Sequence, residues 1–120
     1  MEQNNDLLVV DDNVDSAESL AMLLDLCGYP TRLAHDGPTA LDAVEAALPR
    51  TVILDISMPG MDGYEVARRL RSRYSVEQLQ LVGLSGYGDQ ESHRRAQAAG
   101  FDRLLVKPVD VDAIIAVLRK

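Results

Sequence analysis

Short apolar runs rich in β-branched residues alternate with amphipathic helical patterns five times along the chain. A helix between two strands lets them pair in parallel, and parallel strands buried on both faces show such continuous apolar runs. The alternation therefore predicts an α/β fold, a doubly wound (βα)5 three-layer sandwich with a five-stranded parallel sheet. The expected strands are residues 7–10, 31–34, 52–54, 79–84 and 104–106.

Capping residues and helix breakers predict the helix boundaries. Asn13 is expected to cap the first helix, and Pro38 to begin the second, because its missing N–H would be unpaired in a first turn. Three aspartates are expected to cap the remaining helices: Asp62, Asp89 and Asp110. The expected stops are Gly28, Pro49 and Gly100.

Apolar spacing predicts which helical side chains pack on the sheet. Leu41, Val44 and Leu48 recur at intervals of three and four residues, so the second helix is expected to bury them. Cys27, the only cysteine, is expected to be a small buried hydrophobic residue. A single cysteine forms no intrachain disulfide and no cysteine-built metal site, so a reducing compartment is expected.

Length and charge limit the possible functions. Residues 1–120 are predicted to form one domain, because a chain of this size holds one core. The formal charge of −7 argues against direct DNA binding. The sequence shows no signal-peptide pattern. Its apolar runs are far shorter than the ~20 residues of a membrane span, so a cytoplasmic protein is expected.

One local basic run is interpreted as a solvated helix face: Arg68, Arg69, Arg71 and Arg73.

Polar residues follow the expected strands at the end where open parallel sheets bind ligands. Asp11 and Asp12 follow the first strand, and Asp55 follows the third. Ser85 follows the fourth strand and Lys107 the fifth. Because the carboxyl ends of parallel strands meet at one edge, these five side chains are expected to form one site.

Three carboxylates at one edge would repel one another unless a cation lay among them. Magnesium prefers oxygen ligands and keeps several waters, which leaves room for a phosphate oxygen. Calcium or manganese would also suit these donors, but magnesium suits phosphoryl chemistry best. A carboxylate can attack phosphorus and form an aspartyl phosphate. Lys107 and Ser85 would then contact the phosphoryl oxygens.

Four short motifs, taken together, resemble the receiver domains of bacterial response regulators and hybrid histidine kinases. They are Val9-Val10-Asp11-Asp12, the stretch from Asp55 to Gly63, Leu84-Ser85-Gly86 and Val106-Lys107-Pro108. Each motif alone is weak evidence for the family, but all four in this order at the ends of the expected strands form a very specific signal. The resemblance implies a CheY-like, flavodoxin-like sheet of order 2-1-3-4-5. It fits either a single-domain regulator or a receiver cut from a longer protein such as a hybrid kinase.

The resemblance also implies roles for individual residues. Asp55 would accept the phosphoryl group. Asp12 and Asp55 would bind Mg²⁺ directly, Asp11 mostly through water, and the backbone carbonyl of Ser57 would complete the protein ligands, with Mn²⁺ as an alternative ion. A cis peptide bond is implied before Pro108.

The implied partner is a histidine kinase or a histidine phosphotransfer protein. The chain would assist its own phosphorylation and dephosphorylation without being a turnover enzyme. In the family, the residues two positions after the phosphoacceptor and after the hydroxyl residue border the path of the attacking water, and here they are Ser57 and Tyr87. Neither is a carboxylate base, so slow autodephosphorylation is expected.

Two other functions compete with this interpretation. A phosphatase of the haloacid dehalogenase type also forms an aspartyl phosphate, but it has a second aspartate where this chain has Ser57. A receiver-like module that binds proteins without phosphorylation stays open, because Leu104 stands where the family often has a switching Tyr or Phe. Tyr87 is the candidate for an alternative moving ring, although an exposed loop tyrosine is the simpler description.

Overall fold

The computed structural model describes residues 6–119, which form five strands and five helices in alternation. The strands are β1 (Leu7–Val10), β2 (Thr31–Ala34), β3 (Thr51–Asp55), β4 (Gln80–Ser85) and β5 (Arg103–Val106). The helices are α1 (Val14–Leu26), α2 (Gly37–Ala46), α3 (Gly63–Arg71), α4 (Gln90–Ala99) and α5 (Val111–Leu118). The predicted alternation is confirmed, and each strand end that differs from its prediction moves by one residue.

All five strands are parallel, in the order β2-β1-β3-β4-β5. This is the order that the family resemblance implies. Val10 of β1 pairs with Leu54 of β3, and Asp55 of β3 pairs with Leu84 of β4. The carboxyl ends of β1, β3 and β4 therefore meet at one edge of the sheet.

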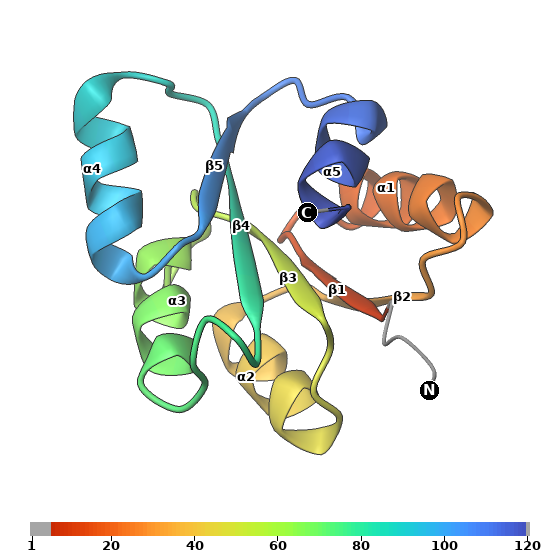
Figure 1. Ribbon diagram of the computed structural model, residues 1–120, viewed down its shortest axis with the longest axis horizontal. Helices are drawn as coiled ribbons and strands as arrows, with labels where there is room; N and C mark the ends of the chain where they lie inside the picture. Colours follow the sequence, from red (N-terminus) through yellow and green to blue (C-terminus); the bar gives the residue numbers. More distant parts are fainter. Residues whose placement is uncertain (1–5, 120) are drawn as a thin grey trace.

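Helices cover both faces of the sheet, with α1 and α5 on one face and α2, α3 and α4 on the other (Figure 1). Because successive strand residues point to opposite faces, β1 supplies both cores. Leu7 and Val9 pack on the α1 and α5 side, whereas Leu8 and Val10 pack on the other. No helix within residues 6–119 has the length and apolar character of a membrane span.

Side-chain caps begin four of the helices. Each cap accepts a hydrogen bond from the backbone N–H three residues later, and the caps are Asn13, Asp36, Asp62 and Asp89. Helix α2 starts at Gly37, one residue before the predicted start, because Asp36 caps it and Pro38 lies within its first turn. Asp110 precedes α5 as predicted, but its side chain makes no capping hydrogen bond.

Two residues predicted to be buried are exposed. Leu48 is 38% exposed because α2 ends at Ala46 and leaves Leu48 beyond the helix. Cys27 is exposed because it occupies the C-cap of α1, past the last turn that packs on the sheet. Val44, in contrast, is buried as predicted. Both errors arise at helix ends, beyond the turns that pack on the sheet.

Arg71 does not lie on a solvated face, contrary to the prediction. Its guanidinium donates to the carbonyl oxygens of Leu79 at 2.8 Å and Gly100 at 2.9 Å. It also pairs with Asp102 at 2.9 Å, and the Asp102 carboxylate accepts the N–H of Leu81 at 2.7 Å. Arg71 therefore joins the end of α3 to β4 and to the turn before β5.

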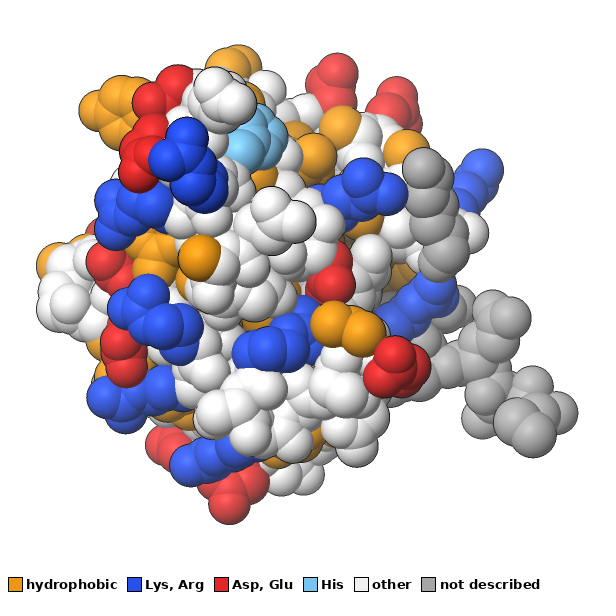
Figure 2. Space-filling view, turned by 60° about the vertical axis from the view of Figure 1, so that its left-hand side comes forward, with side chains coloured by type: hydrophobic (Ala, Val, Ile, Leu, Met, Phe, Trp, Pro, Cys, Tyr) orange, Lys and Arg blue, Asp and Glu red, His pale blue; other side chains and the backbone are white. Residues whose placement is uncertain are grey.

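The other arginines of the run are exposed, as predicted. Arg68 and Arg69 both pair with Glu65 of the same helix, at 3.0 and 2.8 Å. Figure 2 shows Lys and Arg side chains spread over the side of the molecule where α4 lies, with Asp and Glu among them. The run therefore forms a solvated face at these positions. Exposed ion pairs of this kind contribute little to stability.

Candidate functional site

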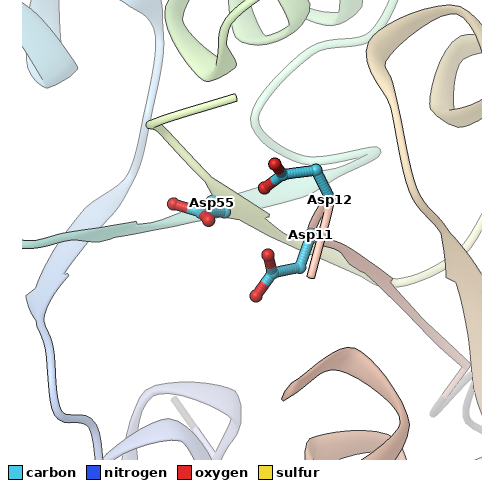
Figure 3. A group of neighbouring side chains, drawn as sticks. All are labelled: Asp11, Asp12 and Asp55. Atoms are coloured by element: carbon cyan, nitrogen blue, oxygen red, sulfur yellow. The ribbon is translucent and has the colours of Figure 1, made fainter. Parts of the chain in front are cut away.

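Three carboxylates meet at the carboxyl edge of the sheet (Figure 3). Asp11 and Asp12 follow β1, and Asp55 is the last residue of β3. Each offers one oxygen, and these oxygens lie within 4.8 Å of one another. Asp55 is 3% exposed and Asp11 is 8% exposed, whereas Asp12 lies at the surface. The structure therefore brings together the carboxylates that the strand ends predicted to meet.

Backbone hydrogen bonds orient the two buried carboxylates. The N–H of Asn13 donates to Oδ1 of Asp11 at 3.0 Å, and the N–H of Ser57 donates to Oδ1 of Asp55 at 3.1 Å. The Nδ1 atom of His35 lies 3.0 Å from the backbone carbonyl oxygen of Asp11. Each carboxylate thus keeps its second oxygen for other partners. Sequence reasoning assigned no role to Asn13 beyond capping and none to His35.

Lys107 brings a positive charge to the edge from the end of β5. Its Nζ lies 3.0 Å from Oδ2 of Asp55, and the two side chains are 39% and 5% exposed. Its backbone N–H donates to the carbonyl oxygen of Ser85 at 2.7 Å. The peptide bond between Lys107 and Pro108 is cis, as the resemblance implies. The lysine is therefore anchored through its backbone while its ammonium group reaches across to β3.

Ser85 ends β4 beside these groups and is 4% exposed. Its Oγ accepts a hydrogen bond from the N–H of Tyr87 at 3.0 Å. A hydroxyl that accepts one bond still has a hydrogen to donate. Tyr87 itself is 72% exposed, which agrees with the description of an exposed loop tyrosine.

Gly63, the first residue of α3, packs directly against the backbone of Asp55. A Cβ placed there would lie 2.6 Å from Cα of Ile56 and 2.7 Å from the carbonyl oxygen of Asp55. The N–H of Gly63 also donates to the carbonyl oxygen of Ile56 at 3.0 Å. Only glycine allows this approach. The sequence motif contains Gly63, but spacing alone assigned it no contact.

The surroundings of Asp11 oppose its ionisation, chiefly because the carboxyl group is buried. Burial is the main cause that raises the pKa of Asp11 above its ordinary value, and the Asp55 carboxylate raises it further. The N–H of Asn13 acts in the opposite direction. The pKa of Asp11 is higher in the folded protein than in the unfolded chain. Asp11 therefore lowers the stability of the fold as pH rises from the unfolded-state pKa through the folded-state pKa.

The three carboxylates suit a divalent cation. When ionised, Asp11, Asp12 and Asp55 carry three negative charges, against one positive charge on Lys107. The difference, 3 − 1 = 2, is the charge of Mg²⁺. Carboxylate oxygens are also the ligands that this ion prefers, and it typically takes only one or two of them directly. The residues present therefore fit a magnesium ion.

Asp11→Asn is expected to stabilise the metal-free protein, because it removes a buried charge and keeps an acceptor for the N–H of Asn13. The expected gain is roughly 4 °C in Tm, the shift that about 1 kcal/mol produces in a domain of this size. Added Mg²⁺ is expected to raise the Tm of the wild type more than that of the variant, which has lost one carboxylate.

Thermal melts in EDTA and in Mg²⁺ measure both effects. Asp42→Asn, at an exposed position of α2, is the control for loss of a surface charge. A Tm of Asp11→Asn below the wild-type value in EDTA would contradict repulsion at this edge.

A groove of about 690 Å³ lies between α1 and the loop before α5, and it reaches the carboxylate edge. Its lining includes Ser16 and Ser19 of α1, Val109, and the site residues Asp11 and Lys107. The groove therefore borders the site at Asp11 and Lys107.

Comparison with known proteins identifies the family. Residues 7–119 match the response regulator receiver domain, so the chain belongs to that family. The chain is 37% identical over 113 residues to the response regulator MprA of Mycobacterium avium, and it spans 49% of that protein. It is 34% identical over 115 residues to a 14.6 kDa uncharacterised protein of Leptolyngbya boryana and spans 88% of it. The alignments cover 94% and 96% of this chain.

Solved structures show the same fold. A putative response regulator from Chloroflexus aurantiacus superposes with a TM-score of 0.87 at 30% identity, covering 98% of this chain and 96% of the other. The chemotaxis protein CheY4 of Vibrio cholerae gives a TM-score of 0.87 at 28% identity, covering 95% of each chain. The chain is thus a CheY-like receiver domain of the two-component signalling class, a class that generally receives phosphoryl groups from histidine kinases and binds Mg²⁺.

Proposed function

We propose that Asp55 accepts a phosphoryl group from a phosphohistidine and that the resulting aspartyl phosphate switches the conformation and partner binding of this domain. The observation that carries the proposal is the pairing of a nearly buried carboxylate, Asp55, with the Lys107 ammonium at 3.0 Å, beside two further carboxylates. Transfer of label from a phosphorylated kinase domain to this chain, with Asp55→Asn as the comparison, tests it.

In the proposed step, a carboxylate oxygen of Asp55 attacks phosphorus and forms a new P–O bond. The P–N bond to the donor imidazole breaks, and the ring nitrogen keeps the electron pair. Lys107 neutralises one phosphoryl oxygen, and the free hydroxyl hydrogen of Ser85 bonds another. Because phosphoryl transfer depends chiefly on positioning and charge neutralisation, these contacts are the main contribution of the chain.

A bound Mg²⁺ would neutralise charge on the phosphoryl oxygens. We assign Asp12 and Asp55 as its direct ligands, Asp11 as a ligand through water, and the backbone carbonyl of Ser57 as the remaining protein ligand. Mn²⁺ is proposed as a substitute with the same oxygen preference. The charge balance of the three carboxylates against Lys107 supports this assignment.

The proposed donor is a histidine kinase or a histidine phosphotransfer protein, acting in the cytoplasm, where receivers of response regulators usually work. The groove between α1 and the loop before α5 is the proposed approach for the donor histidine. We assign residues 1–120 to one receiver domain that promotes its own phosphorylation and dephosphorylation without turning over a substrate. We assign no downstream partner.

Lys107→Ala is expected to keep the fold and to bind Mg²⁺, but to uncouple phosphorylation from conformational change. The ammonium group of Lys107 would bind the phosphoryl group and so connect it to the end of β5. The Lys107 side chain is 39% exposed, so its loss removes little packing from the core. Amide chemical shifts of α4, recorded before and after phosphorylation, measure the coupling.

Arg103→Ala, which removes an exposed cation from the same strand, is the matched control and should respond like the wild type. If Lys107→Ala showed the wild-type shift changes on phosphorylation, the switch role of Lys107 would be wrong.

Tyr87→Glu is expected to shorten the lifetime of the phosphorylated form. We propose that Ser57 and Tyr87 border the water path, and neither side chain is a carboxylate base that would orient the water. A glutamate at position 87 would supply one, with an expected acceleration of up to about tenfold. Loss of the phosphorylated mass is followed in Mg²⁺ buffer after the donor is removed. A decay rate at or below that of the wild type would remove Tyr87 from this role.

A further inference from the structure

Helix α1 carries an exposed apolar surface on the side that faces β2. Met22 is 64% exposed and Leu26, one turn later, is 78% exposed. With Leu33 of β2 they line a groove of about 560 Å³ whose floor includes Ala21, which is 6% exposed. Apolar surface of this kind, gathered at one place, marks an interaction site more often than single exposed residues do.

The groove has an acidic rim, and a hydrogen bond joins the two elements that form it. The Asp25 carboxylate accepts the N–H of Thr31 at 2.9 Å, which ties the last turn of α1 to the first residue of β2. Glu18 and Asp25 both lie on the rim. The residues that line the groove include no Lys, Arg or His, so its two ionisable side chains, Glu18 and Asp25, are both acidic.

We infer that this α1–β2 groove docks the apolar face of a basic amphipathic helix from another protein. Charge complementarity selects this occupant, because apolar residues would fill the groove while flanking Lys or Arg residues meet Glu18 and Asp25. A symmetric contact with a second copy is disfavoured, since it would place the acidic rims of both copies together.

The groove is separate from the carboxylate edge. Met22 and Leu26 line the groove toward β2, whereas Ser16 and Ser19 line the other groove, which leads to Lys107. A helix bound against β2 therefore leaves the approach to Asp55 open. The inference does not depend on the proposed phosphorylation, and its test uses binding as the readout.

The probe is a synthetic peptide of about 18 residues, roughly five helical turns, with leucines on one face and lysines on the other. We expect chemical-shift changes in the ¹⁵N-labelled protein to centre on Ala21, Met22, Leu26 and Leu33. Leu26→Ser is expected to weaken binding about tenfold, as for loss of one buried leucine side chain. Glu18→Lys is expected to weaken it severalfold.

Val76→Ser, which alters another exposed apolar residue, is the matched control and should bind as the wild type does. Leu26→Ser should keep the wild-type Tm and the wild-type rate of labelling by a small phosphoryl donor, which separates lost binding from lost folding. Equal binding of a scrambled peptide of the same composition, unchanged affinity in Leu26→Ser, or shifts centred on Asp11 and Asp12 would each overturn the inference. Self-association abolished by Leu26→Ser, measured by sedimentation equilibrium, would assign the groove to a second copy instead.

Discussion

Asp55→Asn is expected to abolish phosphorylation of the isolated domain by a small acyl or amido phosphate in Mg²⁺ buffer. The neutral amide is not a nucleophile at phosphorus, so labelling should fall by a factor of about a hundred or more. The side chain is nearly buried and its neighbour Ser57 donates an N–H to Oδ1, which an amide oxygen can also accept, so the fold should persist. Intact mass before and after reaction measures the added phosphoryl group.

Two controls accompany this experiment. Wild-type protein in EDTA should also remain unlabelled, because without a cation the carboxylates of Asp11, Asp12 and Asp55 repel the incoming phosphoryl group. Asp42→Asn removes an exposed carboxylate of α2 and should be labelled like the wild type. If Asp55→Asn were labelled to the same extent as the wild type, Asp55 would be excluded as the acceptor.

Gly63→Ala is expected to destabilise the fold by about 2–3 kcal/mol, which is among the larger effects of a single added methyl group. In most helices, alanine is more stabilising than glycine by up to ~1 kcal/mol, so the predicted sign is opposite to the usual one. The reason is the approach of α3 to β3, where a Cβ would meet backbone atoms of Ile56 and Asp55 at 2.6 and 2.7 Å. Backbone atoms cannot move aside as the end of a flexible side chain can.

Urea denaturation measures this effect as a lower midpoint at unchanged slope. Gly86→Ala, at the same edge of the sheet, is the matched control, because no atom lies within 4 Å of a Cβ placed there and its backbone is not left-handed. It should change stability by well under 1 kcal/mol. A Gly63→Ala variant as stable as the wild type would show that α3 can shift away from Asp55 without cost.

The fold and the polar edge could be predicted because parallel sheets obey simple rules. Continuous apolar runs such as residues 7–10 mark strands buried on both faces, and a parallel arrangement sends all their carboxyl ends to one edge. That argument was enough to bring Asp55 and Lys107 together, although they are far apart in the sequence. The strand order came from the family resemblance and not from the runs themselves.

Contacts that depend on tertiary geometry could not be predicted in this way. Arg71 belongs to a run of charged residues, and only the turn before β5 makes it a partner of Gly100 and Asp102. Leu48 keeps the apolar period of α2 but lies beyond its end. The contact of Gly63 with the Asp55 backbone likewise depends on the path of the chain between β3 and α3, which spacing does not specify.

The most direct test of the account is to locate the phosphoryl group on the chain. An acyl phosphate is reduced by borohydride to an alcohol, so a phosphorylated aspartate becomes homoserine, whereas a phosphorylated serine does not. Tandem mass spectrometry of the reduced and digested protein should find homoserine at position 55, only after treatment with the donor and only with Mg²⁺ present. Homoserine at position 11 or 12, or phosphate retained on Ser57 or Ser85, would contradict the assignment of Asp55 as the phosphoacceptor.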